Sequence, residues 1–349
     1  SSFTTTYAVY VSNFQPAGTY SGQVKYAMFH PSNMTAPTTL NQAYAAAGKS
    51  KITATDPNTG ETGSYYTMQD MTTAICNAVN VYGEASETKL VDIRENKLYW
   101  VAKLADGHCW MTQNLDFDID STKIYTHADT DLGWDPDDFN TNATWTPDTT
   151  NGKYNLPVNG NSIPNWSNRS QYPYSANPGD ACYYTTDNNN SESRTTLENC
   201  QLYHDDCEHY HAGNYYNWTA TIASNNSSLI ATNTNATTSI CPARWRLPKA
   251  SNNEFGNLLY KQNITQSALN SSAQYGDNGF INIRKSPLYL TRSGSIDNTS
   301  LYSPGSLGIY SSSTAVKYLG FNKGAIYTDT SNFYGLNAGN GFSVRCIAR

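Results

Sequence analysis

The segment Cys241-Pro242-Ala243-Arg244-Trp245-Arg246-Leu247-Pro248 is the most informative stretch of this 349-residue chain. A second segment, Gly341-Phe342-Ser343-Val344-Arg345-Cys346, also sets a cysteine beside an aromatic residue and an arginine, close to the last residue. In an oxidising compartment the two segments predict a disulfide between Cys241 and Cys346, which fastens the C-terminus to the middle of the fold. The alternative is a pair of unrelated buried thiols.

The first segment also predicts its own packing. Trp245 and Leu247 are expected in the core, and Pro248 is expected to end a strand before a helix. Arg246 is expected to anchor carboxylates or carbonyls through its planar fork of donors. Structure is therefore favoured over chemistry for this segment.

The remaining cysteines extend the disulfide pattern. No two of the seven cysteines are spaced as a CxxC pair, which argues against a structural zinc site. We expect Cys76 to pair with Cys109, and Cys182 to pair with either Cys200 or Cys207. Sequence does not decide between these last two, and an odd count leaves one thiol over if the rest pair.

The composition is polar but carries little charge. Lys and Arg number 22 against 28 acidic residues, so the net charge is −6 and only 14% of residues are charged. Tyrosine (27) and tryptophan (7) replace the missing aliphatic residues as core and surface material. This predicts a folded, loop-rich, mostly β chain of the extracellular kind. The acidic balance argues against nucleic acid, and the lack of a long apolar run argues against a membrane span.

The N-terminal part divides into a hairpin segment and a linker. Residues 7–30 read as two alternating strands, and the hairpin segment with the start of the linker covers residues 1–40. The hairpin resembles the closing strands of immunoglobulin-like modules. The first residues lack signal-peptide features, so an exported form would be processed or truncated. The strands are expected either to pair with a neighbouring subunit or to pack on this chain's own body. A tyrosine near position 8 is considered as an assembly residue, but none is assigned. Residues 41–66 are expected to be a linker.

Residues 67–349 are expected to form the main domain. Met68, Met71, Ile75 and Val79 lie at helical spacing within residues 67–80 and are expected in the core. The other elements expected are strands at 88–94 and 97–104, a polar insertion at about 120–212, a short helix at 213–223, a helix after a capping box at 251–254, and short strands over 279–349.

Five motifs in fixed order resemble a known family. They are Lys97-Leu-Tyr-Trp-Val-Ala-Lys-Leu, Cys109-Trp-Met-Thr-Gln-Asn-Leu, Tyr216-Asn-Trp-Thr-Ala, Cys241-Pro-Ala-Arg-Trp-Arg-Leu-Pro and Ser343-Val-Arg-Cys. Their order, over about residues 88–349, resembles the Fibrobacter succinogenes major paralogous domain of secreted and surface bacterial proteins. With the N-terminal hairpin, the chain is similar to surface proteins of host-attached bacteria of the candidate phyla radiation.

The resemblance implies an α+β, C-type-lectin-like fold related to that of formylglycine-generating enzymes. The family has no firmly assigned activity. This chain departs from the enzyme-like pattern, because residues 249–255 replace the Thr-Glu-x-Glu-Trp continuation.

Two segments are candidate metal sites. Asp129, Asp131, Asp135 and Asp137 surround a glycine and could supply oxygens to calcium, although Pro136 and the missing Glu depart from the EF-hand pattern. A solvated acidic loop is the alternative and is favoured. His204, His209 and His211 could bind zinc or copper, a hypothesis that weakens if Cys207 is oxidised.

No catalytic motif is found: there is no G-x-S-x-G, no HExxH and no phosphate loop. We therefore expect a non-enzymatic extracellular structural protein of the bacterial surface, whose partners are copies of itself in a filament or lattice. The alternative is an adhesin that binds glycans of host or neighbouring cells on the lectin-like face. Its candidate stacking residues are Trp134, Trp145, Trp166 and Tyr172–Tyr174.

Overall fold

The computed structural model describes the part of the chain from residue 39 onward, with gaps. The described residues are 39–57, 60–79, 87–120, 122–127, 131–134, 144–147, 213–224, 235–250, 253–262, 264, 283, 287–291, 293–297, 300–302, 307–315, 317–322, 326–330 and 340–349. The chain divides into two compact units, residues 1–37 and 38–349.

The expected N-terminal hairpin lies outside the described residues. No assembly residue is assigned there, and position 8 is occupied by Ala8. The tyrosines of the hairpin segment are Tyr7, Tyr10, Tyr20 and Tyr26, and all four lie outside the described residues.

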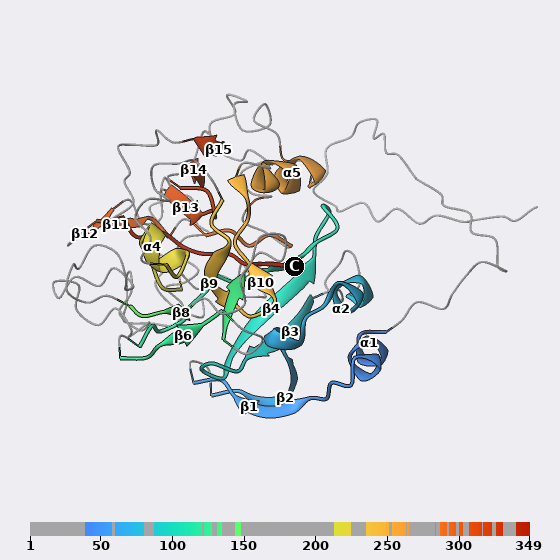
Figure 1. The fold of residues 1–349 in the computed structure, drawn as a ribbon. Helices are drawn as coiled ribbons and strands as arrows, with labels where there is room; N and C mark the ends of the chain where they lie inside the picture. The colour runs from blue at the N-terminus through green and yellow to red at the C-terminus, as the bar shows by residue number, and fades with distance from the viewer. Residues whose placement is uncertain are drawn as a thin grey trace, which may run out of the picture. The chain divides into compact units, whose positions relative to one another are not determined.

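A seven-stranded sheet organises the second unit (Figure 1). Every neighbouring pair of strands in it is antiparallel except β2 and β3, which are parallel. The strand from the end of the chain, β16, lies between β5 and the edge strand β10, so it joins β10 to the rest of the sheet. In order across the sheet, the strands are β1 (Ile52–Thr55), β2 (Thr62–Thr67), β3 (Glu87–Asp92), β4 (Lys97–Lys103), β5 (Cys109–Met111), β16 (Ile347–Ala348) and β10 (Trp245–Arg246).

The other strands form smaller sheets, and the helices are few and short. The architecture is therefore α+β, with mostly sheet. The smaller sheets are β6 (Tyr125–Thr126) with β8 (Thr144–Trp145), β7 (Leu132–Trp134) with β9 (Thr238–Pro242), β11 (Ser295–Asp297) with β12 (Ser300–Tyr302), and β13 (Leu307–Ser311), β14 (Tyr318–Asn322) and β15 (Ile326–Thr330). The helices are α1 (Leu40–Ala46), the 3-10 turn η2 (Met68–Asp70), α2 (Thr73–Ala78), α4 (Trp218–Thr221) and α5 (Glu254–Lys261).

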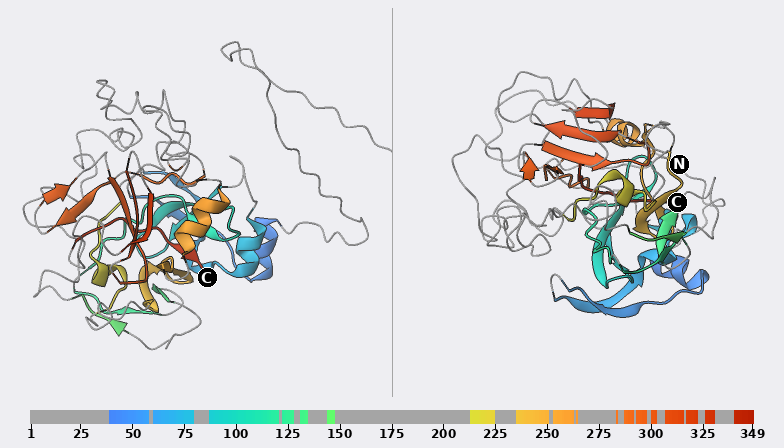
Figure 2. Two further views of the ribbon diagram at one scale, coloured as in Figure 1. Left: turned by 90° about the horizontal axis from the view of Figure 1, so that it is seen from above. Right: turned by 60° about the vertical axis from the view of Figure 1, so that its left-hand side comes forward.

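The large sheet separates two apolar cores, because side chains alternate across a strand. On β5, Met111 belongs to the larger core with α1, α2 and α4, whereas its neighbour Trp110 belongs to the second core. That second core packs Phe255 of α5 and Phe321 of β14 against the sheet. Figure 2 shows the β13–β15 sheet as a layer apart from the blue and green strands. The sheet is thus covered on both faces along its central strands.

Two of the three expected disulfides fall on described residues, and both are present. Cys76 of α2 is joined to Cys109 of β5, with Cα atoms 5.7 Å apart. Cys241 of β9 is joined to Cys346, next to β16, with Cα atoms 5.9 Å apart and a sequence separation of 105. In the chain-entropy model a closed loop of this length stabilises the fold by about 4–5 kcal/mol.

Several expected elements are present. Met68, Met71, Ile75 and Val79 are buried in the core, and residues 87–103 form the hairpin β3–β4, whose turn places Asn96 at φ +59°. Tyr215, Trp218 and Ile222 are also buried, around the short helix α4, and so are Phe255, Leu258 and Leu259 of α5.

The expected linker at 41–66 is wrong. Its residues form most of α1 and the strands β1 and β2, nearly to the end of β2. Thr39 and Gln42 make a reciprocal capping box at the start of α1, and Tyr44 of that helix is fully buried. Ile52 is the one large aliphatic residue of the segment, so the segment has little hydrophobic periodicity. Its packing comes instead from tyrosines: Tyr44 stacks on Tyr66 with ring centroids 3.8 Å apart.

Two helix boundaries also differ from expectation. The helix expected over 67–80 is interrupted at Met71, which follows η2 and has an extended ψ of 133°. The capping box at 251–254 does not start α5, whose N-cap is Asn253 in the left-handed region, without a side-chain cap. The Glu254 carboxylate instead accepts two hydrogen bonds from Arg246, 2.8 Å each, and one from the Lys249 amide, 2.7 Å.

Candidate functional site

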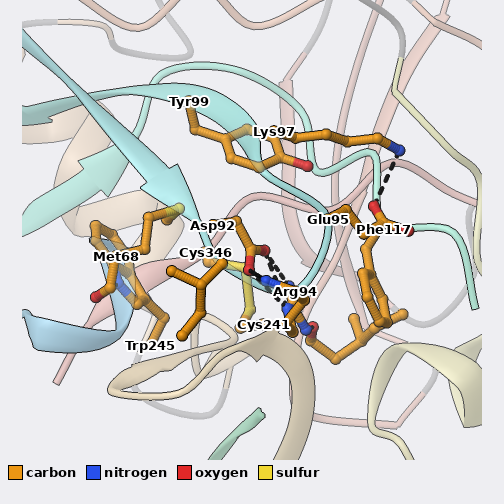
Figure 3. A network of polar contacts seen from close by, with 12 residues as sticks. Met68, Asp92, Arg94, Glu95, Lys97, Tyr99, Phe117, Cys241, Trp245 and Cys346 are labelled. Carbon is orange, nitrogen blue, oxygen red and sulfur yellow. Dashed lines mark hydrogen bonds and ion pairs between the residues drawn. A yellow bond between two sulfur atoms is a disulfide. The ribbon is translucent and has the colours of Figure 1, made fainter. Parts of the chain in front are cut away.

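A buried ion pair lies at the turn between β3 and β4. The Arg94 guanidinium donates from Nε (2.9 Å to Oδ1) and from Nη2 (2.6 Å to Oδ2) to the Asp92 carboxylate. The two side chains are only 2% and 3% exposed. Figure 3 shows the pair beside the Cys241–Cys346 disulfide, and Arg94 Nη1 donates to the carbonyl of Ile240, the residue before Cys241.

The surroundings of this pair account for its charge state. Gln69 Nε2 donates to Asp92 Oδ1 at 2.7 Å, and the Arg94 guanidinium lies 3.9 Å from the centre of the Phe117 ring. Burial opposes the charged guanidinium, but the adjacent Asp92 carboxylate outweighs it and raises the pKa of Arg94. The pair joins η2, the β3–β4 turn and β9, so its role in the fold is a cross-link.

A second buried cation, Lys97, follows the same turn at the start of β4. Lys97 Nζ donates to the Asp116 carbonyl (2.5 Å), to Asp118 Oδ2 (2.9 Å) and to Glu95 Oε2 (3.0 Å), with Asp116 Oδ2 at 3.4 Å. The Lys97 side chain is 6% exposed. Burial raises the pKa of Glu95, although Lys97 partly offsets this effect. Asn214 Nδ2 donates to Asp118 Oδ1 at 2.8 Å, which ties the cluster to the segment before α4.

A third buried cation belongs to the C-terminal motif. Arg345 donates to Asn114 Oδ1 (2.7 Å) and to the carbonyls of Tyr289 (2.6 Å), Leu288 (3.0 Å) and Met111 (3.2 Å). These acceptors are an amide and three carbonyls, and the guanidinium also lies 5.8 Å from the centre of the Tyr310 ring. Burial lowers the pKa of Arg345 to about 10. Through Arg345, the carbonyls of Leu288 and Tyr289 are thus tied to Met111 and Asn114, at a point where Tyr289 has a φ of +47°.

The contacts of these three cations indicate that they stabilise the fold rather than take part in catalysis. A general base or nucleophile needs an open position for a substrate, whereas the donors of Arg94, Lys97 and Arg345 are directed at oxygen atoms of the chain itself. Within the described ranges, no group of three or more His, Cys, Asp and Glu side chains is arranged to hold a metal.

The structure tests one of the four calcium candidates. Asp131 is 8% exposed, and its carboxylate accepts hydrogen bonds from the Thr126 amide (2.8 Å) and from Lys123 Nζ (3.4 Å). Its oxygens therefore support the turn before β7. The other candidates, Asp129, Asp135 and Asp137, lie outside the described residues. So do Cys182, Cys200, Cys207, His204, His209 and His211.

The glycan candidates need a correction at Trp145. Its ring is 1% exposed and packs 5.6 Å from Tyr125, so it is a core residue and presents no face for a sugar to stack on. The backbone of Trp134 belongs to β7, which pairs with β9, and its side chain lies outside the described residues, as do Trp166 and Tyr172–Tyr174. The first part of the expected insertion is therefore packed into the main body.

A partly exposed aromatic group was missed by sequence reasoning. Trp100 and Lys89 are cross-strand partners on β4 and β3, and the Lys89 ammonium lies 4.9 Å from the centre of the Trp100 ring. Glu61 accepts from both Lys89 Nζ and Tyr65 Oη at 2.5 Å. The alternation in residues 97–104 predicted the strand, but only the register of β2, β3 and β4 shows which side chains share a face.

The first strand of the sheet has an open outer edge. β1 pairs with β2 on one side and is the terminal strand in the order of the sheet. Ile52, Thr53 and Thr55 are exposed, and Ala54 is buried. Of the residues that the structure describes, only those of β2 form ladder hydrogen bonds with β1.

No family model, curated protein or solved structure matches this chain. The resemblance to the Fibrobacter succinogenes major paralogous domain therefore stays a prediction from the motifs.

Proposed function

We propose that this chain is a non-enzymatic structural protein of the bacterial surface, which has a C-type-lectin-like fold and assembles with copies of itself into a filament or lattice. The observation that carries the proposal is the outer edge of β1, which no described residue pairs with, on a body whose described part holds two disulfides. Native proteins usually protect such edges, because unpaired backbone groups invite a strand from another chain.

The cysteines support the proposed extracellular compartment. The two disulfides are compatible with an extracellular protein, since disulfides persist in oxidising compartments and are rare in the cytosol. None of the described helices is long and apolar enough to cross a membrane. The fold is further stabilised by the buried ion pairs of Arg94 and Lys97 and by the oxygens that accept hydrogen bonds from Arg345. Such stability suits a subunit that is repeated in a polymer.

The test is the assembly state of native material by negative-stain electron microscopy. We expect regular polymers from the full chain, and folded monomers after deletion of residues 1–30. Undiminished assembly of the deletion variant would contradict the proposal that the N-terminal segment joins subunits.

Glycan binding is a second candidate function. The group that supports it is formed by Tyr65, Glu61, Lys89 and Trp100, which offers aromatic rings and charged hydrogen-bonding groups on one face of the sheet. A glycan array would test it, with Trp100→Ala as the binding variant and Trp145→Phe as the control in the core. Hits lost only in Trp100→Ala would favour an adhesin, and an array without hits alongside regular polymers would favour the structural role.

A further inference from the structure

The outer edge of β1 has a defined pattern of backbone groups that none of the described residues pairs with. The Asp56 amide donates to the Glu61 carbonyl at 2.8 Å, directly beyond the registered pair Thr55–Thr62. In an antiparallel pair, hydrogen-bonded and non-hydrogen-bonded positions alternate. Ile52 and Ala54 therefore direct their N–H and C=O groups to β2, and Thr53 and Thr55 direct theirs outward.

Within the part of the chain that the structure describes, this edge lacks the usual protection against strand addition. Its residues, Ile-Thr-Ala-Thr, are uncharged, contain no proline and pair with β2 without a bulge. The opposite edge of the same sheet is formed by β10, which has only two residues. β1 is therefore the longer open edge of the sheet.

The two faces of β1 differ in polarity. On one face, Ala54 belongs to a small apolar cluster with Val91 and Leu98, and Ile52, which shares that face, is 37% exposed. On the other face, Thr53 and Thr55 are exposed. A strand that extends this sheet should therefore carry apolar side chains on the first face and polar side chains on the second.

Residues 19–26, Thr-Tyr-Ser-Gly-Gln-Val-Lys-Tyr, have this pattern. Tyr20, Val24 and Tyr26 fall in one row of an extended strand, and the polar residues Thr19, Ser21, Gln23 and Lys25 fall in the other. Residues 7–11, Tyr-Ala-Val-Tyr-Val, are instead apolar in both rows.

We infer that residues 19–26 of a second copy of this chain add as a strand to the outer edge of β1, with Tyr20 and Val24 on the face of Ile52 and Ala54. This inference rests on the proposed assembly and identifies the two segments that would join one subunit to the next. Each copy has one donor strand and one acceptor edge, so the contact is head-to-tail, and contacts of this kind propagate into an open polymer when the rotation does not close a ring.

The first experiment blocks the acceptor edge in the full chain. In Thr53→Pro the lost N–H is one that faces outward, so the β1–β2 pairing is retained, whereas the added strand loses a hydrogen bond and meets the proline ring. Thr53→Val, which keeps the N–H and the β-branched shape, is the matched control. We expect Thr53→Pro to raise the concentration needed for assembly by about tenfold or more, and Thr53→Val to leave it unchanged.

The second experiment blocks the donor. Val24→Asp places a charge on the apolar face, and Gln23→Asp places the same charge in the polar row. Assembly should be lost in Val24→Asp and retained in Gln23→Asp. Melting temperatures near wild type in all four variants would show that they are folded. If Thr53→Pro fails this check, it is replaced by Thr55→Pro, whose N–H also faces outward.

The outcomes separate the inference from the proposed function. If the wild type does not polymerise, the proposed assembly is wrong. If it polymerises and Thr53→Pro polymerises equally well, assembly stands but its acceptor is not β1. If Val24→Asp destabilises dilute monomers, residues 19–26 pair within their own chain, which also overturns the inference.

Discussion

Removing the charge of Asp92 should be the most costly single polar substitution at the β3–β4 turn. In Asp92→Asn the side-chain shape is kept, but the Arg94 guanidinium loses its counter-charge at a site where the two side chains are 2% and 3% exposed. An uncompensated buried charge of this kind destabilises a fold by about 3–5 kcal/mol. One of the two carboxylate oxygens also becomes an NH2 group that faces donors from Arg94 and Gln69.

The assay is urea unfolding of the oxidised protein, followed by tryptophan fluorescence. The control is Lys49→Gln, which removes the Lys49–Asp70 pair at 2.6 Å, where the lysine is 47% exposed. An exposed pair of this kind contributes about 0–1 kcal/mol. The double variant Asp92→Asn/Arg94→Met should lose less stability than the two single variants added together, by about 1–3 kcal/mol, because the two groups are in contact. If Asp92→Asn costs no more than Lys49→Gln, the account of the buried pair is wrong.

Three further results are expected. Replacing both Cys241 and Cys346 by serine should lower the free energy of unfolding by about 4–5 kcal/mol, measured by urea unfolding, because the lost bridge closes a loop with a sequence separation of 105. Burial lowers the pKa of His127 below 6.5, despite the Gly133 and Ala223 carbonyls at its ring nitrogens. The stability that neutral His127 contributes is therefore present above pH 6.5 and is lost as the pH falls through the folded-state pKa. Between about pH 7.5 and about pH 5, the melting temperature of His127→Gln should therefore fall less than that of the wild type. Chelation with EDTA should leave the melting temperature unchanged if residues 129–138 are a solvated acidic loop, and a clear fall would instead favour calcium there.

The parts of the fold that sequence predicted are those with a strong local signal. Trp245 and Leu247 are buried as expected, and Arg246 donates two hydrogen bonds to the Glu254 carboxylate. The strands around the turn at Asn96 were predicted from alternation. Each of these depends on apolar or turn residues within a few positions, where periodicity is informative.

The parts that sequence missed depend on distant contacts. β2 pairs in parallel with β3, which follows it after residues 68–86. The Thr-Gly-Ser run at the start of β2 does not predict which strand will be its partner. Lys97 is buried only because three acidic side chains converge on it from the turn and from residues 116–118. Trp145 was predicted as a surface residue for the same reason: its burial follows from the pairing of β8 with β6, which composition does not reveal.

Hydrogen exchange at β1, resolved by residue, tests the assembly contact most directly. In dilute subunits the amides of Ile52 and Ala54 should be protected by β2, while those of Thr53 and Thr55 exchange rapidly. In polymers the amides of Thr53 and Thr55 should become protected too. Amides at Thr53 and Thr55 that exchange as fast in polymers as in dilute subunits would contradict strand addition at this edge.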